Sequence, residues 1–171
     1  MLRLAKPFLD LALWRITPAQ LPASWLLLVI VGAAMALLEV VGALLLPSPP
    51  DQFPIRVALS VALPLGFAWA ILSLTRNTQR FLQTATALLG VGLLAHLILY
   101  PLNLAIDMIG TDRPVAIPIG LLSFVVLVWY LLASAHIWRA ALESGLSLGI
   151  AISVGYLVLS VAIAKLMLPD V

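Results

Sequence analysis

The sequence predicts an all-α membrane protein, a bundle of five transmembrane helices preceded by a short amphipathic helix. Hydrophobic residues make up 64% of the 171-residue chain and charged residues 9%, whereas a soluble domain is about half apolar and a quarter charged. Five apolar stretches each approach or exceed the roughly 20 residues that cross a bilayer. Deep inside these stretches, Glu39 is the single residue with a formal charge.

Residues 1–21 are expected to form an interfacial amphipathic helix, and residues 22–171 the five-span transmembrane domain. On a helical wheel Lys6 and Asp10 project from one side of the first segment, while Phe8 and Leu9 lie largely elsewhere. This pattern is typical of a helix that rests on the membrane surface. Charged residues interrupt its apolar core, so we do not expect a cleavable signal peptide.

The five predicted spans end at polar or helix-breaking residues. They cover about 25–46, 55–74, 81–103, 115–137 and 145–168. The first is followed by the proline-rich stretch 47–51, and the second by the polar turn 75–80. A polar loop that includes Asp107 follows the third span, and Arg139 and Glu143 mark the turn after the fourth.

The basic residues favour a cytoplasmic N-terminus, because cytoplasmic loops collect Lys and Arg. In this orientation the cytoplasmic residues are Arg3, Lys6, Arg15, Arg76, Arg80 and Arg139, and the other face holds Arg56, Arg113 and Lys165. An odd number of spans then places the C-terminus on the opposite side of the membrane.

Glu39 is the sharpest candidate for a site, since a charged side chain inside a span is costly unless it is paired, neutralised or hydrated. Counted from the cytoplasmic ends, Glu39 and His96 each lie about 15 residues into their spans, at a depth of about 22 Å. Glu39 shares its helix face with small residues, and His96 shares its face with Tyr100 and Asn103. We therefore expect Glu39 and His96 to meet between the first and third spans.

Two interpretations of this polar pair remain open. In the functional one, His96 and Glu39 relay a proton or hold an ion. In the structural one, they form an interhelical hydrogen bond or ion pair. A transport path needs more polar residues than a single pair that Tyr100 and Asn103 extend by one turn, which favours the structural interpretation.

The remaining motifs are weak. His136 is expected to be a wet interfacial residue at the end of the fourth span, and Gly145, Gly149 and Ser153 form a small-residue stripe for helix packing. The chain contains no cysteine, and we recognise no metalloprotease, phosphate-loop, hydrolase or dinucleotide motif in it. We therefore expect no catalytic residue, cofactor or metal site, and no nucleic-acid binding.

Three segments carry a family resemblance. The run Arg80–Gly90 with Tyr100, and the later Trp129 and Tyr156, are similar to the last three spans of Yip-type proteins, named for membrane partners of Ypt/Rab GTPases. The segment 15–24 resembles uncharacterised proteobacterial inner-membrane proteins that share the later segments. The resemblance implies five helices with a cytoplasmic N-terminus, but the short lead before the first span gives no basis for a Rab-binding role.

The function expected from these observations is non-enzymatic. The protein is predicted to act in a bacterial inner membrane, with its C-terminus in the periplasm, through helix–helix or lipid interaction, as an assembly or envelope factor. Its expected partners are membrane lipids and other membrane proteins or further copies of itself. The alternative is a small oligomeric proton-coupled transporter or channel that uses Glu39.

Overall fold

The computed structural model describes residues 2–45, 52–110 and 113–167, with side chains from Lys6 onward. Within these ranges all regular structure is helical. The elements are α1 (Leu2–Ala12), η1 (Pro18–Gln20), α2 (Trp25–Leu44), α3 (Phe53–Leu74), η2 (Thr78–Arg80), α4 (Phe81–Ile109), α5 (Ala116–Ala141) and α6 (Leu146–Met167). The helices α2 to α6 are long and apolar enough to cross a membrane. The predicted all-α five-helix bundle is confirmed, and the chain is a multi-pass integral membrane protein.

Two helices run further than the spans expected from the sequence. α4 passes the expected end at Asn103 and stops only at Gly110, whose φ of 86° is easily adopted by glycine. Asp107 therefore lies within α4, and its expected place in a loop is wrong, because nothing before Gly110 breaks the helix. α5 likewise continues to Ala141. The expected span ends at Leu46 and Leu168, and the loop residues 47–51 and 111–112, lie outside the described residues.

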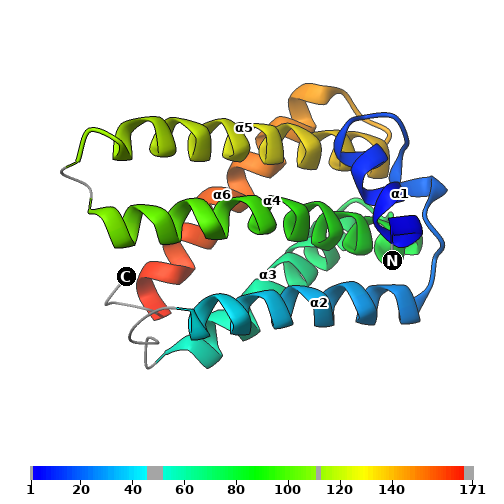
Figure 1. Cartoon of the computed structure of the whole chain (residues 1–171). Coiled ribbons are helices and arrows are strands. Elements are labelled where there is room, and N and C mark those ends of the chain that lie inside the picture. Colours follow the sequence, from blue (N-terminus) through cyan, green and yellow to red (C-terminus); the bar gives the residue numbers. More distant parts are fainter. Residues whose placement is uncertain (1, 46–51, 111–112, 168–171) are drawn as a thin grey trace.

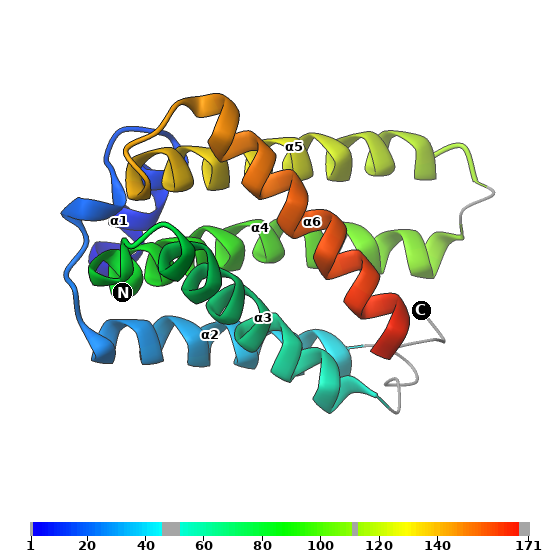
Figure 2. The same cartoon turned by 180° about the vertical axis from the view of Figure 1, so that it is seen from behind.

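The five long helices form two layers. α2, α4 and α5 lie side by side with α4 in the middle (Figure 1), and α3 and α6 cross this layer on its other face (Figure 2). α3 packs against α2 and α4, whereas α6 packs mainly against α5. α3 and α6 contact each other only slightly. The second layer is therefore loosely packed, and the rings of Phe67 on α3 and Tyr156 on α6 contact each other at a centroid distance of 5.2 Å.

Packing is tight in the half of the bundle that contains α1. There α4 is buried without interruption from Thr84 to Gly92. The opposite half is looser, since α4 is only partly covered from His96 onward. We call these halves the α1 end and the open end. The open end is where a cavity can form.

α1 is docked into the bundle through one face. Phe8, Leu11 and Ala12 are buried, and α1 contacts α4 and α5. The Phe8 ring occupies the space beside Gly90, where a Cβ would lie 2.2 Å from the ring. The opposite side of the helix, which includes Lys6 and Leu9, is exposed. This two-sided character fits a helix at a membrane surface, and that location stays a prediction.

Two further contacts join the helices at the α1 end. Gly149 on α6 lies against the backbone of Ala135 on α5, so close that a Cβ would be 2.3 Å from the Ala135 carbonyl oxygen. Within the small-residue stripe, Gly149 and Ser153 are buried but Gly145 is exposed. Arg80 donates hydrogen bonds to the carbonyl oxygen of Ala141 at 3.0 Å and to the Glu143 carboxylate. The bond to Ala141 gives a hydrogen-bond donor to a backbone carbonyl group at the end of α5, where such groups lack partners within the helix.

Candidate functional site

Glu39 lies where α2 packs against α4, and only 5% of its surface is exposed. The hydroxyl group of Tyr100 on α4 donates a hydrogen bond to Glu39 Oε2. Gly42 makes room for the tyrosine ring, because a Cβ at this position would lie 2.3 Å from Tyr100 Cε1. The buried carboxylate thus has a donor from the neighbouring helix, as a buried charge requires.

His96 lies beside the same carboxylate. Its Nε2 atom is 3.7 Å from Glu39 Oε1, which is too long for a hydrogen bond. Its Nδ1 atom lies 2.8 Å from the carbonyl oxygen of Gly92, one turn earlier in α4. The structure therefore brings Glu39 and His96 together at the α2–α4 contact.

The hydrogen bond of the His96 ring identifies which nitrogen donates. A carbonyl oxygen can only accept, so Nδ1 carries a hydrogen and donates it to Gly92. Nε2 is the ring nitrogen that faces the Glu39 carboxylate.

A cavity of about 480 Å³ adjoins this pair and is lined by residues of all five long helices. Most of the lining residues come from α3, α4 and α6, and α3 and α6 contribute apolar side chains such as Leu63 and Val161. All three tyrosines of the chain, Tyr100, Tyr130 and Tyr156, line it. Its volume falls within the roughly 300–1,000 Å³ of small-molecule sites. The cavity combines apolar walls with a small polar set, as ligand sites do.

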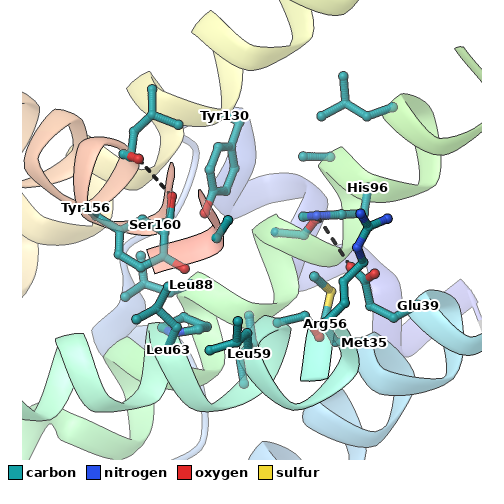
Figure 3. A pocket seen from close by; sticks show the side chains of 18 of the residues that line it. Met35, Glu39, Arg56, Leu59, Leu63, Leu88, His96, Tyr130, Tyr156 and Ser160 are labelled. Atoms are coloured by element: carbon teal, nitrogen blue, oxygen red, sulfur yellow. Dashed lines mark hydrogen bonds and ion pairs between the residues drawn. The ribbon is translucent and has the colours of Figure 1, made fainter. Parts of the chain in front are cut away.

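The polar groups of the cavity are unevenly distributed. Figure 3 shows Glu39, His96 and Arg56 gathered at one end, with Arg56 pointing toward the other two, and Tyr156 and Ser160 at the other end. Asn103 on α4 also lines the cavity and is exposed. The arrangement can hold a molecule with a charged group at one end and an apolar body along α3 and α6.

Sequence reasoning did not identify several residues of this site. Arg56, Tyr130, Tyr156 and Ser160 line the cavity with the predicted Glu39 group, but Arg56 was considered only for its effect on orientation. A signal was available, because hydroxyl groups inside apolar spans are expected to face protein or water and not lipid. What was missing was the knowledge that α3 and α6 flank the same face of α4.

His136 is not the wet interfacial residue that was expected. It is 5% exposed, its Nε2 lies 3.0 Å from the carbonyl oxygen of Ile16, and its ring stacks on Trp14 at a centroid distance of 5.2 Å. The segment after α1 folds over the end of α5 and covers the histidine. His136 therefore serves to hold the N-terminal segment in place.

Among the described residues, no group of three or more His, Asp or Glu side chains could hold a metal ion. No protein-family model matches the chain, and comparisons with curated proteins and with solved structures found no match either. The similarity to Yip-type proteins therefore stays a prediction from the quoted segments. The cavity and its lining residues are the features of the chain that bear on its function.

Proposed function

We propose that the protein is a non-enzymatic inner-membrane protein that works by binding a membrane lipid in the cavity between α3 and α6. The observation that carries this proposal is the cavity of about 480 Å³, with apolar residues from α3 and α6 in its lining and charged groups at one end. Lipids are the amphipathic molecules that surround such an opening. A lipid-bound surface would in turn suit an assembly or envelope role with other membrane proteins.

The proposed orientation keeps the N-terminus in the cytoplasm and the C-terminus in the periplasm. Six basic residues against three support it, as the positive-inside rule requires. The described helices agree with an odd number of crossings, because α1 lies at one end of the bundle and α6 finishes at the other (Figure 1). The open end of the cavity would then face the periplasm. Fusion of a reporter enzyme after residue 167 would test this, and a cytoplasmic reporter would contradict it.

Lipid retention during purification tests the main proposal. The protein is extracted in mild detergent, and co-purifying lipid is quantified per protein by mass spectrometry. The variant Ser160→Phe places a ring in the cavity, whereas Val158→Phe adds the same ring to an exposed position of α6 that does not line it. We expect Ser160→Phe to lose about four-fifths of the retained lipid and Val158→Phe to keep it. Equal retention by both variants, or no lipid on the native protein, would refute the proposal.

Proton-coupled transport is the second candidate, and the contact between the Glu39 carboxylate and the His96 ring inside the spans favours it. Polar groups continue beyond the main cavity, since a second cavity of about 10 Å³ shares Tyr130 and Tyr156 with it and is also lined by Ser134 and Ser153. This volume is about that of one water molecule. Within the described residues, the buried hydroxyl groups of these two serines have no hydrogen-bond partner.

A flux measurement in reconstituted vesicles separates this candidate from lipid binding. Glu39→Gln keeps the shape of the side chain but cannot ionise, so a pH-dependent flux should disappear while folding is retained. The matched control is Glu143→Gln, which makes the same change at an exposed turn. A flux that is equal in the native protein and in Glu39→Gln would exclude a relay through Glu39.

A further inference from the structure

The charged end of the cavity presents a guanidinium that has no ion-pair partner among the described residues. The Glu39 carboxylate is engaged by Tyr100 and His96 on α4. Arg56 lines the same cavity with its positively charged guanidinium, and within the described residues it forms no ion pair. Charge complementarity therefore calls for a ligand with a negative group at this end.

Arg56 also lies at the depth where a lipid carries its charge. It is the fourth residue of α3, so it lies about 5 Å along the helix from the first residue, Phe53. The polar head groups of a bilayer flank the hydrocarbon region at this level. Below Arg56, the cavity continues between Leu59 and Leu63 of α3 and Leu157 of α6. A molecule with its anionic group at Arg56 would therefore extend its apolar part into the membrane interior.

We propose that the cavity binds a glycerophospholipid whose phosphodiester is held by Arg56 beside His96 (Figure 3), with the Asn103 amide as a further lining donor and one acyl chain between α3 and α6. The inference rests on the proposed lipid-binding function and adds the chemical group that is recognised. The planar guanidinium of arginine donates two parallel hydrogen bonds to phosphate oxygens, and this geometry suits a phosphodiester. Asn103 is exposed at the mouth of the cavity and can supply a further donor.

Glu39 has a defined part in this site. Its carboxylate accepts a hydrogen bond from Tyr100 and faces His96, so it is turned toward α4 and leaves the Arg56 guanidinium available to a ligand.

Competition for a fluorescent phosphatidylglycerol probe in detergent micelles tests the proposal. Unlabelled phosphatidylglycerol should displace the probe, whereas diacylglycerol with the same acyl chains, which lacks the phosphate, should require at least about tenfold more. Free inorganic phosphate should not compete, because it cannot fill the apolar part of the cavity. A fatty acid tests whether a carboxylate can replace the phosphate, and we expect it to bind more weakly than the phospholipid.

Substitutions test whether Arg56 binds the phosphate group. We expect Arg56→Gln to weaken phosphatidylglycerol binding about tenfold and to leave diacylglycerol binding unchanged, with Arg56→Lys in between. The matched control is Arg76→Gln, at the α1 end and outside the cavity, which should bind like the native protein. Circular dichroism confirms that each variant is folded.

The outcomes separate the two proposals. If diacylglycerol competes as well as phosphatidylglycerol, or if Arg56→Gln binds like Arg76→Gln, phosphate recognition is wrong. The lipid-binding function still stands in that case, provided that Ser160→Phe blocks the probe. If neither lipid binds, both proposals fail.

Discussion

Gly149→Ala tests whether α6 is held to α5 by direct contact between their backbones. The added Cβ would lie 2.3 Å from the Ala135 carbonyl oxygen and 3.1 Å from its carbonyl carbon. Ordinary contact begins at 3.4 Å, so α6 has to move away by about 1 Å (3.4 − 2.3 = 1.1 Å). A gap of 0.5–1 Å already forfeits a quarter to a half of the attraction between the facing atoms. The substitution therefore loosens the whole contact and not a single atom pair.

The expected cost follows from two opposing terms. Overpacking of a close contact costs about 1–3 kcal/mol, whereas alanine is favoured over glycine inside a helix by about 0.5–1 kcal/mol. Gly149→Ala should therefore destabilise the protein by up to about 2.5 kcal/mol. Gly155 is the control on the same helix, because no atom lies within 4 Å of a Cβ built there. Gly155→Ala should leave stability unchanged or raise it by up to about 1 kcal/mol.

Unfolding of both variants in the same detergent, followed by circular dichroism against temperature and denaturant, measures the difference. We expect Gly149→Ala to unfold several degrees below Gly155→Ala. Because α6 also lines the cavity, a shift of α6 should alter lipid binding. Lipid retention by Gly149→Ala therefore gives a second readout. If the two glycine variants unfold at the same temperature, the proposed backbone contact between α5 and α6 does not limit their packing.

Three further perturbations have defined outcomes. Tyr100→Phe removes the donor to the buried Glu39 carboxylate and should cost roughly 1–3 kcal/mol in detergent unfolding, since a buried acceptor loses its partner; a change below 0.3 kcal/mol would show that this bond is immaterial. At the turn after α5, the hydrogen bond and charge of Arg80 lower the pKa of Glu143 below its usual 4.5. This stabilisation is present above that value and is lost as the pH falls below it, so the melting temperature should decline more steeply under acid conditions in the native protein than in Glu143→Gln, and parallel curves would argue against it. Leu11→Ala removes a fully buried side chain of α1 and should release the N-terminal segment, seen as faster proteolysis there while α2 to α6 remain folded; unchanged proteolysis would mean that α1 is held by other contacts.

The sequence contains enough information to place Glu39 beside His96. Both side chains lie on helices that start at the same end of the bundle, and the rise of 1.5 Å per residue turns position into depth. Glu39 is the one charged residue deep in a span, and few other polar residues lie at the same depth, so few partners were available to it. Depth and polarity together were sufficient for this one contact.

The rest of the cavity could not be derived in the same way. The five long helices are apolar on almost every side, so periodicity does not distinguish the face toward lipid from the face toward protein. Gly32 is buried and the adjacent Ala33 is exposed, yet both suit either environment. The lateral order of the helices, which brings Arg56 and Tyr156 around α4, depends on packing between distant segments. His136 was misjudged for the same reason, because the segment that covers it is 120 positions away.

The bond between His136 and Ile16 also has a consequence for the order in which the protein is assembled. It joins a segment that is synthesised before α2 to α6 to the end of α5, 120 positions later. Phe8 and Leu11 are in the same position, since they are buried against helices that are synthesised after them. The N-terminal segment can therefore dock fully only after α4 and α5 have been made and have reached their places. Its docking is a late step of assembly, which requires α5 in position.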